Sequence, residues 1–146
     1  MTEKMEALKR QLTEMAKSMG AVDARVASRE SLDGPPSSDP TFMFPKAQSV
    51  ISYAVPLGSD WIEDYFGKKD RETFGRIMFE KYQLIDTIGK AMLAVLRTRG
   101  FDGAVPSPNG SYRRDAASAG AMIPDFSHRY AALASGLGPW AGAETC

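Results

Sequence analysis

The residues best suited to chemistry gather in one short stretch, from Ile123 to Gly138. Within five positions it contains an aspartate, a serine, the only histidine of the chain and an arginine, namely Asp125, Ser127, His128 and Arg129. An imidazole titrates near neutral pH and can donate a proton. These residue types favour a ligand-binding site at the mouth of a helix. The same residues also fit an ordinary capped helix that packs on a sheet.

The sequence around these residues predicts a short helix. Asp125 or Ser127 can serve as its N-cap, because a short polar side chain accepts a hydrogen bond from an otherwise unpaired backbone N–H. Three alanines then favour helix, and Gly136 ends it. The small side chains let this helix lie close to a flat or bulky neighbour.

Two longer helices are expected elsewhere in the chain. Apolar residues recur at three- and four-residue steps near the N-terminus, which predicts an amphipathic helix over the first twenty residues that ends at Gly20. A second apolar stripe predicts a central helix of about seven turns from Phe74 to Arg99. Its basic end, Arg97 and Arg99, suits the negative end of the helix dipole.

Three segments are predicted to be strands. Val22 to Ala27 alternates apolar and polar residues, and Phe101 to Val105 is a further short candidate. Ser49 to Val55 is nearly continuously apolar, which is typical of a strand buried on both faces. A loop rich in Ser, Asp, Gly and Pro separates the first strand from this one, over residues 29–40. The fold class is therefore α/β, with a few-stranded sheet flanked by helices.

Two charged clusters have both a functional and an ordinary interpretation. Three carboxylates lie close together at Asp60, Glu63 and Asp64, beside aromatic residues that can form the wall of a pocket. They can bind a metal, but the lysines that follow favour a solvated helical turn. Arg113 and Arg114 can bind an anionic group, or they can be an exposed basic pair on a loop.

Composition limits the classes of function. The chain has 146 residues, the size of one domain, and its 18 basic residues balance its 18 acidic ones. This balance argues against a general nucleic-acid binder or a protein attracted to anionic membranes. No apolar run is long enough to span a membrane, and the N-terminus lacks the apolar centre of a secretory signal. We therefore expect a cytoplasmic protein.

Two segments resemble a known family, the cobalamin-dependent iron–sulfur reductases typified by epoxyqueuosine reductase, with reductive dehalogenases as distant relatives. One is IPDFSHRYAALASGLG, in which six residues match the family's run: Arg129, Ala131, Ala132, Gly136, Leu137 and Gly138. The other is FPKAQSVISYAVP, from Phe44 to Pro56, which looks like the family's early core strand. The resemblance spans roughly residues 22–138 and implies part of a nitroreductase-like cobalamin-binding domain.

The chain departs from the family pattern at several positions. The aspartate that donates a proton in epoxyqueuosine reductases falls on Met122, which cannot donate one. An arginine that helps to hold the corrin in those enzymes falls on Ser37, and His128 replaces an acidic residue. These departures favour a sister branch of the family with another substrate.

By this resemblance the chain is the N-terminal portion of an oxidoreductase. Cobalamin is the implied cofactor, with Asp125, Ser127, His128 and Arg129 as the expected cofactor-binding residues and no catalytic residue or metal ligand assigned. The implied substrate is a small molecule or a modified nucleoside. The 4Fe–4S clusters of such reductases need about four thiolates each, whereas the only cysteine here is Cys146. Clusters are therefore expected only in a full-length form, and this portion alone is expected to be inactive.

Two alternatives stay open, a non-catalytic corrin carrier and a truncated remnant that is inactive and self-associates through apolar surface. The last eight residues, 139–146, do not follow the family pattern. A shifted reading frame that begins within the Trp140 codon permits a continuation that looks like the family. We therefore treat residues 1–138 as one domain. A shifted reading frame is our hypothesis for the tail, and a chance fit to the family pattern is the alternative.

Overall fold

The computed structural model describes residues 2–108, 112–114 and 123–138. In chain order, the elements are α1 (Glu3–Ser18), β1 (Asp23–Ser28), β2 (Ser49–Ala54), α2 (Ile62–Phe66), α3 (Glu72–Thr98) and α4 (His128–Ser135). Three short 3-10 turns lie between β1 and β2, at Arg29–Ser31, Pro36–Ser38 and Pro40–Phe42. The fold is mixed α/β, and none of the described helices is long and apolar enough to cross a membrane.

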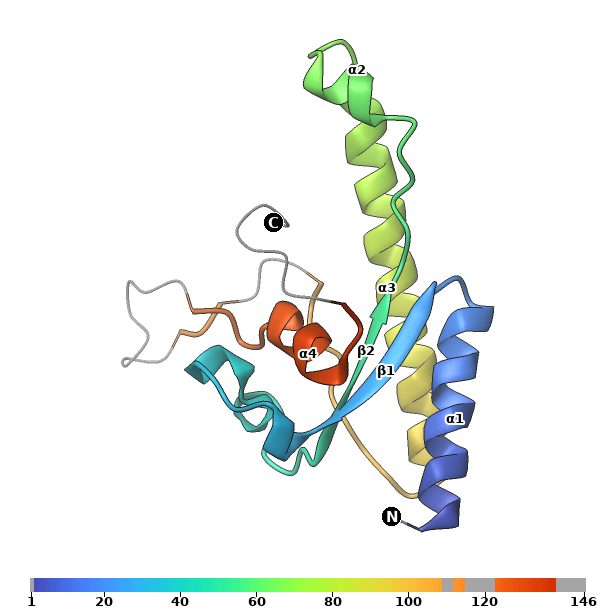
Figure 1. The fold of residues 1–146 in the computed structure, drawn as a ribbon, viewed down its shortest axis with the longest axis vertical. Helices are drawn as coiled ribbons and strands as arrows, with labels where there is room; N and C mark the ends of the chain where they lie inside the picture. Colours follow the sequence, from blue (N-terminus) through green and yellow to red (C-terminus); the bar gives the residue numbers. More distant parts are fainter. Residues whose placement is uncertain (1, 109–111, 115–122, 139–146) are drawn as a thin grey trace.

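The two strands form an antiparallel pair with helices on both faces (Figure 1). Ala24 pairs with Tyr53, and Val26 pairs with Ile51. Because side chains alternate along a strand, these four residues point to one face. There, the main core joins α1 and α3 to the sheet, and its buried members are Leu8, Leu12, Ala16, Ala21, Ala24, Ile88 and Met92.

The opposite face of the sheet carries α4. A second, smaller core forms here from Leu32, Phe126 and Ala131, with Val50 of β2 packed against it. Two of its members come from outside regular elements, Leu32 from the turn-rich loop after β1 and Phe126 from the segment before α4. The described sheet therefore lies between a two-helix layer and a one-helix layer, as Figure 1 shows.

The far end of α3 extends away from this three-layer body (Figure 1). We call residues 57–83 the arm, which comprises the chain leaving β2, the short helix α2 and the first turns of α3. An aromatic cluster holds α2 to α3, with the rings of Tyr65 and Phe74 centred 4.3 Å apart and those of Trp61 and Phe74 4.8 Å apart. Other aromatic side chains of the arm face solvent, since Phe66 is 73% exposed and Phe79 is 63% exposed.

Most predicted elements are confirmed to within about two residues, but two predictions are wrong. Residues 101–105 form no strand; Gly103 and Pro106 disfavour a strand ladder, and Val105 instead packs beside Gly89 of α3. The predicted burial of β2 on both faces is also wrong, because Val50 to Ala54 are only half-buried. In the described part of the chain β2 pairs with β1 alone, so β2 is not an interior strand.

Candidate functional site

The predicted cap of α4 is confirmed, and of the two candidates it is Ser127. Its hydroxyl oxygen accepts a hydrogen bond from the Tyr130 backbone N–H at 3.4 Å. At the other end Gly136 has a φ of +76°, the left-handed conformation that glycine adopts most readily. Helix α4 therefore begins and ends where the sequence predicts.

One face of α4 is occupied by the protein's own core. Ala131 is only 2% exposed and packs with Leu32 and Phe126, and Ala134 also contacts this cluster. The small side chains thus bring α4 close to the sheet and the turn-rich loop. Any ligand of α4 must bind the opposite side.

The outer face of α4, defined as His128, Arg129 and Leu133, is exposed. Arg129 and Leu133 are one helical turn apart and therefore lie side by side. Leu133 is 42% exposed, so an apolar side chain adjoins a guanidinium group. At Gly136, one turn further on, there is open space where a side chain would start. The outer face thus combines apolar surface with hydrogen-bond donors.

His128 is held by a contact with another segment. Its Nε2 lies 2.9 Å from the carbonyl oxygen of Ser107. A carbonyl only accepts hydrogen bonds, so Nε2 carries the hydrogen, and in the neutral ring Nδ1 is the acceptor. The neutral imidazole therefore offers a ligand an acceptor at Nδ1, and proton donation through Nε2 requires loss of the Ser107 contact.

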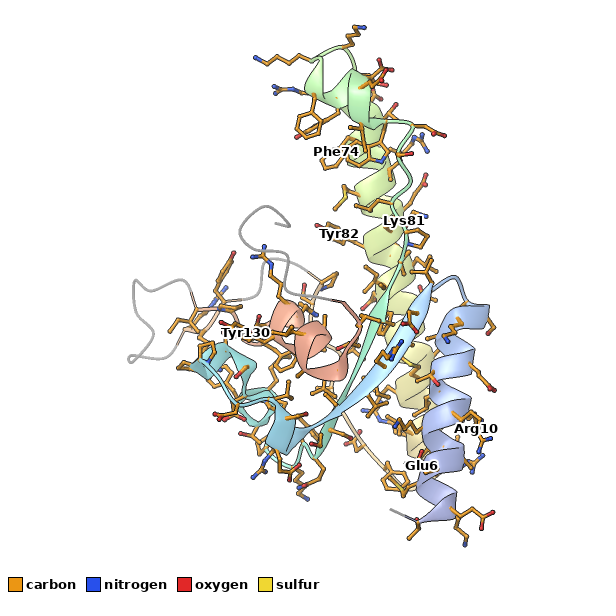
Figure 2. All side chains as sticks on the ribbon, viewed as in Figure 1. Glu6, Arg10, Phe74, Lys81, Tyr82 and Tyr130 are labelled. Carbon is orange, nitrogen blue, oxygen red and sulfur yellow. The ribbon has the colours of Figure 1, made fainter. Side chains whose placement is uncertain are left out.

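The turn-rich loop adjoins the start of α4. The Ser127 backbone N–H donates to the Ser37 carbonyl at 2.7 Å. The buried Ser38 Oγ lies 3.0 Å from the Leu32 carbonyl oxygen and 2.8 Å from that of Pro35, so its single hydrogen is shared between these two acceptors. In Figure 2, Tyr130 lies between α4 and this loop. The structure therefore brings together Ser37 and Ser127, two positions that the resemblance links to cofactor binding.

Arg113 fastens the same loop, a role that the sequence did not indicate. Its Nη2 donates to the Pro36 carbonyl at 2.6 Å, its Nε donates to the Pro124 carbonyl at 3.3 Å, and its guanidinium lies 3.8 Å from the centre of the Phe42 ring. The side chain is half-buried, so Arg113 is not an exposed basic residue, whereas Arg114 is exposed. No local sequence pattern distinguishes the two arginines. Of the two carbonyls that Arg113 binds, that of Pro36 is distant in sequence, and that of Pro124 lies outside the helices and strands.

The four predicted cofactor-binding residues thus have different surroundings. Arg129 and His128 are exposed, the Ser127 hydroxyl serves as the cap, and Asp125 is half-buried just before the helix. Met122, Trp140 and Cys146, with the rest of the tail at 139–146, lie outside the described residues.

Two surface depressions lie away from α4. One of about 470 Å³ lies on the exposed side of α1, and one of about 380 Å³ lies beneath α2. Trp61 lines the second, together with Asp64 and Asp70. Asp60, Glu63 and Asp64 are exposed around the turn of α2, which confirms the solvated helical turn. Among the described residues, no three His, Cys, Asp or Glu side chains are grouped to hold a metal ion.

Comparison with protein-family models, with curated proteins and with solved structures finds no match for this chain.

Proposed function

We propose that the chain is the N-terminal, cobalamin-binding portion of an oxidoreductase that resembles epoxyqueuosine reductase, with a nitroreductase-like fold in its complete form. The observation that best supports this is the contact between the matching segment around α4 and the loop at Ser37, the position on which the corrin-holding arginine of the family falls. The loop at Ser37 and the cap residue Ser127 are joined by a 2.7 Å backbone hydrogen bond, although 90 positions separate them in sequence. A ligand on α4 would therefore also adjoin the turn-rich loop.

The outer face of α4 fits the chemistry of a corrin. A corrin ring is broad and largely apolar over its face, and its rim carries amide arms. Leu133 and the open space at Gly136 suit contact with the ring, and the Arg129 guanidinium suits the oxygen atoms of the amides. His128 offers Nδ1 to an amide N–H, because Nε2 is already bound to Ser107.

In this proposal the protein's residues bind and orient the cofactor. When bound, cobalamin supplies a cobalt centre that can be reduced. Arg129 and His128 fix the rim of the ring through hydrogen bonds, and Leu133 excludes water from part of its face. With a single cysteine, this chain does not bind an iron–sulfur cluster by itself, so reduction of a small molecule or modified nucleoside belongs to a longer form. A cytoplasmic location is part of the same proposal.

Two observations favour the alternative of a remnant without activity. The described sheet has only two strands, so each strand has one edge without a strand partner in this part of the chain. Large apolar side chains are also exposed, above all Phe66 and Phe79. A non-catalytic corrin carrier is the other alternative, and it would bind cobalamin as a stable unit.

A visible-absorption titration tests the proposal. Hydroxocobalamin is mixed with the purified chain, and the spectrum and the corrin retained after gel filtration are recorded. We expect a change in the corrin bands and retention of about one corrin per chain. An unchanged spectrum with no retained corrin would refute cofactor binding and favour the remnant.

Two variants locate the binding site. Leu133→Asp places a charge where the ring would lie, and Arg129→Ala removes the donor to the rim. Each variant is expected to lower the affinity for cobalamin about tenfold, which is roughly the effect of losing one charged hydrogen bond or one apolar contact. Arg10→Ala is the matched control, because it removes an exposed arginine on α1 (Figure 2). If Arg10→Ala weakened binding as much as Arg129→Ala, the site would not be on α4.

A further inference from the structure

The exposed side of α3 carries a regular stripe that the proposed function does not use. Its residues are spaced alternately by four and three positions: Glu72, Arg76, Phe79, Gln83, Asp86 and Lys90. This spacing keeps one row of side chains facing the same direction over five turns, as in the seam of a two-helix coiled coil. The stripe begins in the arm, which extends beyond the three-layer body (Figure 1).

The stripe is exposed to solvent and has an apolar side chain near its middle. Phe79 is 63% exposed, the Arg76 side chain is 61% exposed and that of Lys90 is 69% exposed. The core of the body lies on the other side of α3, where Ile88 is fully buried. A neighbouring helix could therefore lie along the stripe without displacing any part of the described core.

The charges of the stripe are complementary to themselves when reversed. From the N-terminal end they are acidic, basic, acidic and basic, at Glu72, Arg76, Asp86 and Lys90. A second α3 can run antiparallel to the first, with residue 81 of both helices at the same level along the axis. This register places Glu72 against Lys90 of the other copy. The same register places Arg76 against Asp86, and two-fold symmetry makes each pair occur twice. A parallel arrangement in the same register would instead oppose like charges.

The same register brings the apolar residues together. Phe79 of each copy lies opposite Gln83 of the other, whose methylene groups can cover the ring. The two Phe79 residues are then about 6 Å apart along the helix axis, near the two-fold centre. The centre of the interface is thus apolar and its ends are charged, which is the usual arrangement in protein interfaces.

We propose that two copies of this chain pair antiparallel along α3, with Glu72 and Arg76 of each copy facing Lys90 and Asp86 of the other. Within each copy, Arg76 already pairs with Glu80 and Lys90 with Asp86. Exposed ion pairs contribute little in water, so these partners can be exchanged or shared on association. The overlap of about 27 Å makes the contact smaller than a standard interface, so the dimer is weak and sensitive to salt.

Sedimentation equilibrium of the full chain with a charge-exchange series tests this pairing. We expect the wild type to form dimers at tens to hundreds of micromolar and to dissociate as NaCl is raised. Glu72→Lys alone, or Lys90→Glu alone, opposes like charges twice and should weaken dimerisation about tenfold. The double variant, Glu72→Lys with Lys90→Glu, should restore it. Arg10→Glu on α1 is the control that reverses an exposed charge outside the stripe, and it should leave dimerisation unchanged.

The orientation can be measured independently with a spin label. Ala94 is exposed on α3 outside the stripe, and a label at Ala94→Cys in a Cys146→Ser background does not disturb the paired charges. The antiparallel register separates the two labels by about 39 Å along the axis, whereas parallel helices would place them side by side. Circular dichroism of each variant verifies that the helices are intact. A wild-type chain that is monomeric throughout, a double variant that does not recover, or labels close together would overturn the proposal.

Discussion

Helix α3 closely approaches Tyr53 and Val105 at Gly89, and this approach gives a sharp prediction. A methyl group at this position would lie 2.7 Å from Cγ1 of Val105 and 2.9 Å from Oη of Tyr53. The Tyr53 side chain is held in place, because its hydroxyl donates to the Ile85 carbonyl at 2.6 Å. Val105 lies in the irregular segment that follows α3, and it must shift if a methyl group is added.

Two opposing effects determine the stability of Gly89→Ala. Alanine favours an α-helix over glycine by about 0.5–1 kcal/mol. Overpacking a close contact costs about 1–3 kcal/mol, since the neighbours must leave their preferred positions. The steric cost is the larger effect, so we expect a net loss of about 1 kcal/mol. For a chain of this size the melting temperature should fall by about 2–4 °C.

Gly75→Ala is the matched control on the same helix. Nothing lies within 4 Å of a methyl group placed there, so only the gain in helix propensity applies. Urea unfolding followed by circular dichroism at low protein concentration should show Gly75→Ala more stable than wild type and Gly89→Ala less stable. Equal or greater stability of Gly89→Ala than wild type would show that α3 does not approach Tyr53 and Val105 as described.

Further predictions concern the same packing and the turn-rich loop. Burial, followed by the nearby Asp86 carboxylate, raises the pKa of the Tyr53 phenol from its usual 10.0 to about 12. The folded state thus disfavours ionisation of Tyr53. Its contribution to the free energy of unfolding is therefore fully present below pH 10 and is lost as the pH rises toward 12. The difference in unfolding free energy between wild type and Tyr53→Phe should therefore shrink between pH 9 and pH 11.5, and a constant difference would contradict the assignment. Ser38→Ala removes the buried hydroxyl that binds two loop carbonyls and should cost about 1–3 kcal/mol in urea unfolding, whereas exposed Ser31→Ala should change stability little. If the two serine variants were equally stable, the Ser38 contacts would not hold the loop.

Regular periodicity explains why most helices and strands could be predicted from the sequence. The apolar stripe of α3 continues for many turns, and α1 and α4 end at glycines, so their boundaries depend on local chemistry. Strand β2 was located correctly because of its β-branched residues. The burial of β2 was predicted wrongly. Burial depends on how many strands lie beside β2, and the residue pattern of one strand does not contain this information.

The candidate site was predictable only in part, for a similar reason. The cap at Ser127 and the exposed Arg129 follow from position within one helix. The Ser107 contact of His128 and the clamp formed by Arg113 depend on loops that meet through the tertiary fold. Neither contact has a spacing rule that could reveal it in advance.

Hydrogen exchange with and without cobalamin is the most direct test that the outer face of α4 binds a corrin. The full chain is labelled in D2O at a cobalamin concentration that saturates the spectral change, and exchange is compared peptide by peptide. We predict slower exchange over residues 123–138 and in the adjoining turn-rich loop, with no change over Glu3–Ser18 of α1. Unchanged exchange around α4 in the presence of bound cobalamin would contradict the account.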